Sequence, residues 1–241
     1  MLRVRSLSYT YPGSTQPVLA DVSLSLDAGE RVALVGPNGS GKTTLALHLN
    51  GLVGALDGSV EVAGIACTKA NLAVIRQRLG LLFQDANDQL FMQTVREDVA
   101  FGPANLALTK HEVTHRVERS LSAVSASHLA SRAPHHLSGG EKRRVAIAAV
   151  LAMQPDVLVF DEPTSGLDPK GCAELSSLLN GLEQTQLIIT HDLPFALATC
   201  PRVLVLDSGT IEVDMSTADL MADQALLERH DLALPFGYAN S

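Results

Sequence analysis

A glycine-rich segment that ends in Lys-Thr-Thr carries the clearest chemistry in this sequence. Residues 36–43 read GPNGSGKT, the G-x-x-x-x-G-K-[ST] pattern of a phosphate-binding loop, and the apolar residues 31–35 before them are typical of a buried strand. Glycines let backbone N–H groups approach an anion closely, and the helix that we expect over 43–49 adds its unpaired N-terminal donors. The segment predicts that the chain binds a nucleoside triphosphate.

Each residue of this segment has a candidate role in holding phosphate. Lys42 places a cation near the β- and γ-phosphates, and Thr43 offers its hydroxyl to Mg²⁺. The alternative is a glycine-rich turn that merely links a strand to a helix, and the complete motif between a strand pattern and a helix pattern disfavours it. The residues that we expect to bind nucleotide are Gly36, Pro37, Asn38, Gly39, Ser40, Gly41, Lys42, Thr43 and Thr44.

Two acidic residues and one histidine follow apolar runs that predict buried strands. Asp161 and Glu162 come directly after residues 157–160, and His191 follows residues 187–190. Ligands of open α/β sheets lie at the carboxyl ends of the strands. There Asp161 can hold Mg²⁺, and Glu162 can orient or deprotonate an attacking water. His191 can hydrogen-bond a γ-phosphate or that water.

Two further segments admit both a functional and a purely structural interpretation. Gln84 follows the apolar residues 79–83, where its carbonyl could reach a metal or a water, or where it simply ends a strand. Ser138 has the type and place of an N-cap for a helix that we expect over 142–153, and the two glycines after it expose backbone donors. This is a second anion site by the same physics as the first, unless it is only a capped helix.

Composition disfavours some classes of protein. The 241 residues are 46% hydrophobic and carry a net charge of −8, which favours a sizeable core and argues against a nucleic-acid binder. No window approaches about 18 uninterrupted apolar residues, so we expect any membrane role to act through a partner. The 3 cysteines form neither a metal-ligand spacing nor a disulfide framework, which fits a reducing cytosol.

Periodicity predicts an α/β fold. Alternating residues 2–9 and 18–26 indicate antiparallel strands of a small β region, and residues 58–63 indicate another strand. Residues 94–127 are expected to be mostly helical, with two Thr-x-x-Glu capping boxes. The other expected elements are helices over 72–78 and 170–182, a tight loop over 163–169, a hairpin over 203–206 and 210–213, and a tail over 226–241 with a short helix and an irregular end.

Six motifs, in this order, resemble those of ATP-binding-cassette (ABC) ATPases. They are residues 36–43, Gln84, LSGGE at 137–141, VLVFDE at 157–162, SGLD at 165–168 and His191. The resemblance covers about residues 1–225. It implies a P-loop NTPase fold with a mainly parallel core sheet, an N-terminal antiparallel β subdomain and an inserted α-helical subdomain. It also implies one ATP-binding domain over 1–241, with the helical subdomain at about 85–150 and a tail at about 226–241.

The same resemblance implies roles that the residues alone leave open. Tyr11 matches the aromatic residue that stacks on adenine, and Asp168 would couple two ATP sites across a dimer. Gln84 and Asp161 would complete the shell of Mg²⁺ and water. Glu141 stands where the family more often has glutamine, and we expect this change to be tolerated. ATP on the phosphate loop of one subunit would be covered by four residues of a second subunit, namely Ser138, Gly139, Gly140 and Glu141.

A finer resemblance concerns the importer class. Residues 83–103 are similar to the corresponding segment of energy-coupling-factor importer ATPases, and residues 134–169 look most like the cobalt- and nickel-type members. This implies a location on the cytoplasmic face of the membrane, a transmembrane coupling subunit that contacts the loop after Gln84, and a substrate-capturing membrane subunit.

Several alternatives stay open at this point. Vitamin importers, biotin among them, share these motifs, and the solute is selected by another chain. The second ATP-binding subunit is either a copy of this chain or a paralogue. A soluble ABC ATPase that serves no transporter is the rival class, but the chain has no coiled-coil insert or second cassette, and its acidic balance disfavours nucleic acid as a partner.

Overall fold

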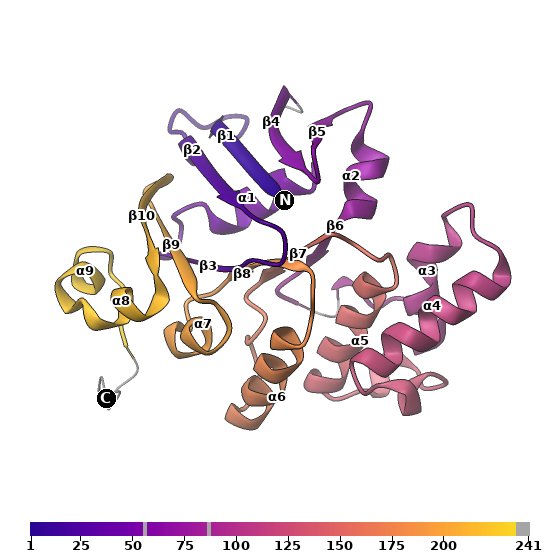
Figure 1. The fold of residues 1–241 in the computed structure, drawn as a ribbon. Coiled ribbons are helices and arrows are strands. Elements are labelled where there is room, and N and C mark those ends of the chain that lie inside the picture. Colours follow the sequence, from indigo (N-terminus) through magenta and orange to yellow (C-terminus); the bar gives the residue numbers. More distant parts are fainter. Residues whose placement is uncertain (55–56, 86–87, 235–241) are drawn as a thin grey trace.

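The central sheet contains six strands and is mainly parallel (Figure 1). This computed structural model describes residues 1–54, 57–85 and 88–234. β9 and β10 pair antiparallel, and the other neighbours pair in parallel, which confirms the expected core sheet. The spatial order is β10 (Thr210–Ser216), β9 (Arg202–Asp207), β3 (Arg31–Val35), β8 (Thr185–Ile189), β7 (Val157–Asp161) and β6 (Leu79–Leu82).

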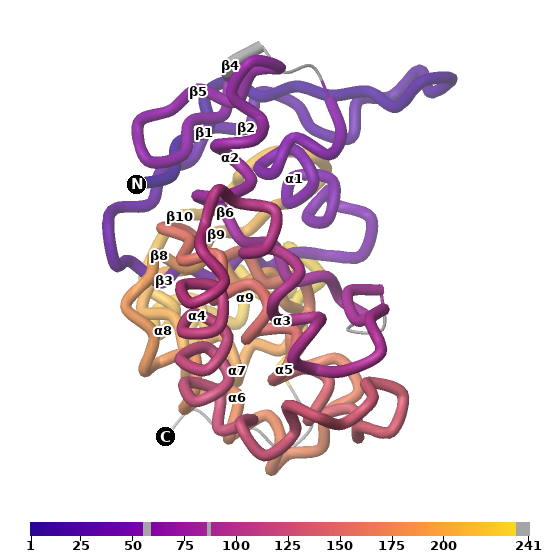
Figure 2. Tube along the Cα trace, turned by 90° about the vertical axis from the view of Figure 1, so that its right-hand side faces the viewer, coloured from indigo at the N-terminus to yellow at the C-terminus, as the bar shows by residue number. Residues whose placement is uncertain are grey.

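A second sheet, which is antiparallel, covers one side of the central sheet (Figures 1 and 2). It confirms the expected N-terminal β region and adds a strand of four residues that the sequence analysis missed, β5. The register pairs Leu2 with both Leu26 and Val62, so that one alternating apolar face points inward. The order is β2 (Leu19–Leu26), β1 (Leu2–Tyr9), β4 (Asp57–Val62) and β5 (Ile65–Thr68).

The strand before the phosphate loop, β3, separates two hydrophobic cores. Val32 and Leu34 point into the core shared with the antiparallel sheet, whereas Ala33 and Val35 point into the core shared with the helices. All four are fully buried, as a strand covered on both faces requires. The first core also contains α1 (Lys42–Leu49), and the second contains α5 (Gly139–Leu151), α6 (Pro169–Asn180) and α7 (Leu193–Thr199).

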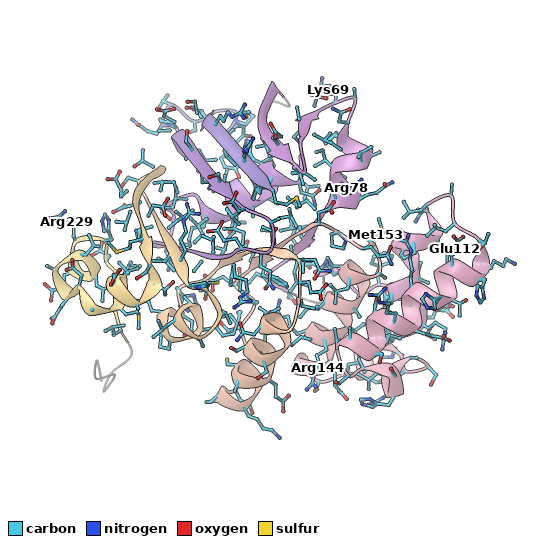
Figure 3. All side chains as sticks on the ribbon, viewed as in Figure 1. Lys69, Arg78, Glu112, Arg144, Met153 and Arg229 are labelled. Atoms are coloured by element: carbon cyan, nitrogen blue, oxygen red, sulfur yellow. The ribbon has the colours of Figure 1, made fainter. Side chains whose placement is uncertain are left out.

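The helical part of the fold lies beside β6, at the right of Figure 1. The predicted stretch over 94–127 forms α3 (Val95–Ala104) and α4 (Lys110–Ala123), both of which pack on α5. Both predicted capping boxes are present: Thr94 with Glu97 and Thr109 with Glu112. Glu112 lies at the start of α4, where Figure 3 labels it. The expected inserted helical subdomain is therefore confirmed.

The remaining boundaries differ from prediction at several places. α5 begins at Gly139, three residues before the predicted start, because Ser138 caps the helix directly ahead of the two glycines. α7 and α8 (Thr217–Ala222) were not predicted from the sequence, while α2 (Leu72–Arg78) agrees with prediction. In the predicted tail, α9 (Gln224–Arg229) is the short helix, and residues 235–241 lie outside the described residues. Within the described part of the chain, none of the helices has the length and apolar character needed to cross a membrane.

Candidate functional site

The phosphate loop connects β3 to α1, and its glycines are required by close backbone contacts. Gly36 and Gly41 have φ angles of 151° and 105°, in the region that side chains disfavour. A Cβ at Gly36 would overlap the carbonyl oxygen of Leu206, and one at Gly41 would lie 2.8 Å from the carbonyl oxygen of Val18. The loop therefore packs between β9 and the segment before β2, and its shape is fixed by this chain alone.

The Lys42 ammonium lies against the loop that it serves. Its Nζ donates hydrogen bonds to the carbonyl oxygens of Gly36 and Pro37, both at 2.8 Å. Burial lowers the pKa of Lys42, and the nearby carboxylates of Glu162 and Asp161 partly offset this shift. Because both hydrogen-bond acceptors are neutral, the positive charge remains available to attract an anion.

Asp161 ends β7 and presents a carboxylate to the loop. It is buried, and its Oδ1 has no hydrogen-bond partner among the residues that the structure describes. Burial raises the pKa of Asp161, and the neighbouring Thr43 hydroxyl partly opposes that shift. A buried, unpartnered carboxylate oxygen is costly unless a cation binds it. Together with the hydroxyl of Thr43 and the amide of Gln84, it forms an all-oxygen donor set that fits Mg²⁺.

Glu162 and His191 are in direct contact at the ends of β7 and β8. His191 Nδ1 lies 2.8 Å from Glu162 Oε2, and the two side chains are 71% and 14% exposed. Glu162 has a φ of 47°, and its N–H donates to the Ile189 carbonyl oxygen at 2.9 Å. This left-handed backbone conformation turns the Glu162 carboxylate away from the strand direction. Such strain is common at functional sites, where a side chain must keep a fixed orientation.

One cavity of about 410 Å³ collects most of the predicted site residues. Predicted residues from four separate segments of the chain line it, and they come from the phosphate loop and from the ends of β6, β7 and β8. Gln84 is among them, so the end of β6 lies beside the phosphate loop. The lining residues are Val18, Asn38, Gly39, Gly41, Lys42, Thr43, Thr44, Gln84, Asp161, Glu162 and His191.

Tyr11 lies next to the phosphate loop without lining this cavity. Its Oη is 3.2 Å from Thr44 Oγ1, and its ring is 38% exposed. The Tyr11 and Tyr9 rings meet edge to face with centroids 5.0 Å apart, and the Tyr9 and His48 rings do so at 4.4 Å. Tyr11 is thus attached to the loop and has an accessible ring, as an adenine-stacking residue needs.

The second predicted cradle is separate from the cavity. Ser138 Oγ accepts from the Glu141 N–H, and Glu141 Oε2 accepts from the Ser138 N–H at 2.8 Å and from its hydroxyl at 2.9 Å. This capping box lowers the pKa of Glu141, and Arg132 lies 3.3 Å from the carboxylate. Asp168 caps α6 by accepting from the Gly171 N–H at 2.7 Å. Ser138, Gly139, Gly140, Glu141 and Asp168 are therefore not brought to the cavity within one chain.

Sequence reasoning missed one contact and two residues near the site. Ser138 was predicted as a cap, but the Ser-x-x-Glu spacing that makes Glu141 its partner was overlooked. Val18 lines the cavity with no motif to mark it. Arg143, two residues after Glu141, is buried and donates to the backbone of Gln84. Nothing in the sequence distinguishes it from Arg144, the more exposed arginine at the next position of the same helix.

Comparison with known proteins gives consistent relatives over the whole chain. The family model described as "ABC transporter" matches residues 19–165. A putative ABC transporter ATP-binding protein of Streptomyces avermitilis is 52% identical over 237 residues, which is 98% of this chain and 90% of the relative. The energy-coupling factor transporter ATP-binding protein EcfA of Methanothermobacter thermautotrophicus is 46% identical over 240 residues, which is 98% of this chain and 77% of the relative.

Solved structures show the same similarity. CbiO1 of Clostridium perfringens, described as part of the ABC transporter complex cbiONQ, superposes with a TM-score of 0.84 at 34% identity, covering 97% of this chain and 95% of its own. The ATP-binding cassette MJ0796, solved as a dimer in a post-hydrolysis state with ADP and phosphate, has a TM-score of 0.78 at 28% identity. That match covers 90% of this chain and 99% of MJ0796.

Proposed function

Because this chain belongs to the family of ABC transporter ATPases, we propose that it powers an energy-coupling-factor importer that takes up a transition-metal ion, cobalt or nickel. The observation that carries the ATPase chemistry is the single cavity lined by the phosphate loop, Gln84, Asp161, Glu162 and His191. The similarity to EcfA and to CbiO1 supports the importer class. The choice of metal over a vitamin rests on residues 134–169, whose sequence is closest to the cobalt and nickel type.

The residues of the cavity divide the work of hydrolysis. Backbone N–H groups of residues 36–44 and the Lys42 ammonium bind the phosphates, and Tyr11 stacks on the adenine. Glu162 orients the attacking water and accepts its proton, which its fixed direction allows. His191 holds the γ-phosphate and, through its 2.8 Å contact, the Glu162 carboxylate.

Three oxygen donors would hold Mg²⁺, namely those of Thr43, Gln84 and Asp161. The unpartnered Oδ1 of Asp161 supports this assignment, because a cation would satisfy it. When bound, Mg²⁺ neutralises charge on the β- and γ-phosphates. Gln84 lies two residues after the end of β6, so a shift of this strand end would move its amide relative to the phosphate loop.

Hydrolysis requires a second ATP-binding subunit, either a copy of this chain or a paralogue. Ser138, Gly139, Gly140 and Glu141 of that subunit cover the ATP on residues 36–44 of this one, and Asp168 couples the two sites. None of these five residues lines the cavity of its own chain, which supports this arrangement. MJ0796, a structural neighbour, has been solved as a dimer. ATP then favours the closed dimer, and hydrolysis lets it open.

The membrane coupling subunit contacts the surface that follows Gln84. Phe91 and Phe101 are 63% and 46% exposed, and their rings meet edge to face at 5.0 Å. Buried Asp98 fixes this turn by accepting from the N–H groups of Phe91 and Met92. Exposed paired aromatics are typical anchors of an interface. Residues 86–87 of the same loop lie outside the described residues.

The assembly places this chain on the cytoplasmic face of the membrane, with a substrate-capturing membrane subunit in the same complex and no nucleic acid. Within residues 1–241, which act as one ATP-binding domain, the helical subdomain at about 85–150 carries both the aromatic pair and the Ser138 cradle. It thereby connects the membrane partner to the ATP site. The final tail, from residue 226, adds contacts between the two ATP-binding subunits.

Co-purification from membranes with this chain tagged tests the proposal. We expect a multi-span coupling subunit and a capture subunit to be recovered, and the complex in vesicles to accumulate ⁵⁷Co²⁺ or ⁶³Ni²⁺ with ATP. A matched variant with Phe91→Ala and Phe101→Ala should lose the coupling subunit and keep ATP binding. Uptake of biotin instead of either metal would contradict the solute, and recovery of no membrane protein with full soluble ATPase activity would contradict the importer.

A further inference from the structure

Arg143 is a buried arginine whose guanidinium donates to backbone carbonyl oxygens of three described residues. Its side chain lies on the second turn of α5 and is 5% exposed. Nη1 donates to the Phe83 carbonyl oxygen at 3.0 Å, and Nη2 donates to the Gln84 carbonyl oxygen at 2.7 Å and to that of Ser165 at 3.5 Å. One guanidinium therefore joins three segments that are far apart in the sequence.

Burying the charge of the Arg143 guanidinium costs free energy, which argues against a role in packing alone. Burial lowers the pKa of Arg143, and the nearby Asp85 carboxylate only partly opposes the shift. Neutral carbonyl acceptors do not repay the desolvation of a guanidinium as an ion pair would. Its neighbour Arg144, which forms an exposed ion pair with Glu174 at 2.7 Å and is labelled in Figure 3, shows the ordinary surface alternative on the same helix.

The end of β6 is held from its other side by Gln89. Its Nε2 donates to the Leu81 carbonyl oxygen, and its Oε1 accepts from the Phe83 N–H, both at 3.2 Å. The backbone of Phe83 is thus fixed at its N–H by Gln89 and at its carbonyl by Arg143. The residue that this clamp positions is the next one, Gln84.

Gln84 forms a wall between two cavities. On one side is the cavity that contains Lys42 and Asp161. On the other is a cavity of about 360 Å³ that Gln84 shares with Arg143 and with Ser165, among others. The guanidinium therefore lies behind Gln84, away from the phosphate loop, and reaches the ATP cavity only through the backbone that it holds.

We propose that Arg143 is a positioning residue that fixes the Gln84 amide over the ATP cavity relative to helix α5. Because α5 begins with the Ser138 cradle, the same contact makes movement of that cradle and movement of Gln84 one event. Two of the donors of a planar fork reach two successive carbonyls, which a lysine ammonium cannot do with the same geometry. The inference rests on the proposed role of Gln84 in hydrolysis.

A double-mutant cycle tests it, with turnover and ATP affinity measured on the full chain. Arg143→Lys should lower kcat by about tenfold, the cost of weakened hydrogen bonds to a charged group. The affinity for a fluorescent ATP analogue should stay within about twofold, because Arg143 does not touch the cavity. In the Gln84→Ala background, the same substitution should lower kcat by less than about twofold, because the side chain that it positions is gone.

Controls separate this role from a loss of folding. Arg96→Gln removes an exposed arginine of the same subdomain, which lies 3.8 Å from Glu118, and should leave kcat unchanged. The kcat of Arg143→Gln, which keeps one amide donor group, should lie between those of the wild type and Arg143→Lys or equal that of Arg143→Lys. Equal loss from Arg143→Lys in both backgrounds would overturn the positioning role and leave Gln84 in place. An unchanged kcat for Gln84→Ala alone would overturn the role of Gln84, and this inference with it.

Discussion

The two glycine-rich helix starts of this chain both present backbone N–H groups, but one is tightly packed and the other is exposed. Gly36 and Gly41 of the phosphate loop are packed against backbone of β9 and of Val18. Ser138 and its two following glycines are accessible, and a Cβ at either glycine would meet nothing within 4 Å. Each places unpaired N–H groups at a helix start, so the difference lies in what surrounds them.

This difference shows which half of the chemistry the chain completes alone. The phosphate loop has its shape, its cation and its acidic residues from the same polypeptide, collected in one cavity. The Ser138 cradle has donors but does not line that cavity, and its own Glu141 accepts the hydrogen bond of the Ser138 hydroxyl. In the proposed dimer, the cradle faces the ATP bound on the other subunit. Substitutions at matched positions of the two helix starts should therefore have different consequences.

Glu162→Gln should have the largest effect on turnover and should stabilise the dimer in which two subunits enclose ATP. Glutamine keeps the size and the hydrogen-bond acceptor of the side chain but cannot accept the proton of the attacking water. We expect turnover to fall by about 10³-fold, with the chain folded and able to bind ATP. Size-exclusion chromatography in saturating ATP and Mg²⁺ should then show a dimer. A variant that stays monomeric would contradict the ATP-bridged pair.

Lysines of the two helix starts offer the next comparison. Lys42→Ala should weaken ATP binding by about 100-fold, because it removes a buried cation that donates near the β- and γ-phosphates. Lys142→Ala removes a lysine from the start of α5 and should leave the affinity of the monomer for ATP unchanged. Equilibrium titration with a fluorescent ATP analogue measures both. Equal losses would mean that both helix starts bind the same nucleotide within one chain.

Glycine-to-alanine substitutions compare the two backbones. Gly41→Ala should destabilise the fold by about 2 kcal/mol, because its φ of 105° and the Val18 carbonyl leave no room for a methyl group. Gly140→Ala should instead stabilise it by about 0.5 kcal/mol, since alanine is the better helix residue and nothing lies within 4 Å.

Both substitutions should lower turnover, because Gly140→Ala places a methyl group where a phosphate must approach. Thermal unfolding and ATPase activity, measured on the same preparations, separate stability from catalysis. A Gly140→Ala chain that hydrolyses ATP at the wild-type rate would show that this cradle does not contact nucleotide. A Gly41→Ala chain as stable as the wild type would show that the phosphate loop is less tightly packed than its contacts indicate.

The sequence predicted the residues that carry chemistry better than the contacts that position them. Motif residues were recognised because phosphate binding demands fixed types at fixed spacing, and Lys42, Asp161, Glu162 and His191 do meet in one cavity. The predicted bounds of four strands of the central sheet, β3, β6, β7 and β8, agree with the observed ones to within two residues. These strands are buried on both faces, so their apolar runs are unambiguous.

The parts that were missed depend on tertiary contact or on very short segments. β5 has four residues and α7 has seven, too few for a clear period, although Asp192 before a Leu-Pro pair could have indicated the start of α7. Arg143 belongs to a helix that contains an exposed arginine at the next position, and only the fold buries one and not the other. The direct contact of His191 with Glu162 also required the structure, since 29 residues separate them.

The smallest expected effect concerns the one departure from the family pattern, Glu141. Its matched control is Glu112, which forms the same capping box with Thr109 on α4 (Figure 3) and does not line the ATP cavity. The Ser138 backbone N–H and hydroxyl lower the pKa of Glu141, and those of Thr109 lower the pKa of Glu112. A carboxyl whose pKa is lower in the folded chain contributes stability above its unfolded pKa and loses it as pH falls through the folded value.

Glu141→Gln and Glu112→Gln should therefore reduce the melting temperature slightly at pH 7. The difference from wild type should shrink as pH falls below the ordinary glutamate pKa of 4.5, and it should vanish only below the lowered pKa of the folded chain. The KM for ATP should distinguish the two variants. Only Glu141→Gln removes a negative charge from the place where the partner's γ-phosphate binds, so it should lower the KM for ATP by about threefold. Glu112→Gln should leave KM unchanged. If both variants or neither changed KM, the carboxylate of Glu141 would be acting as a helix cap alone, and the Ser138 cradle would need another explanation for its exposed donors.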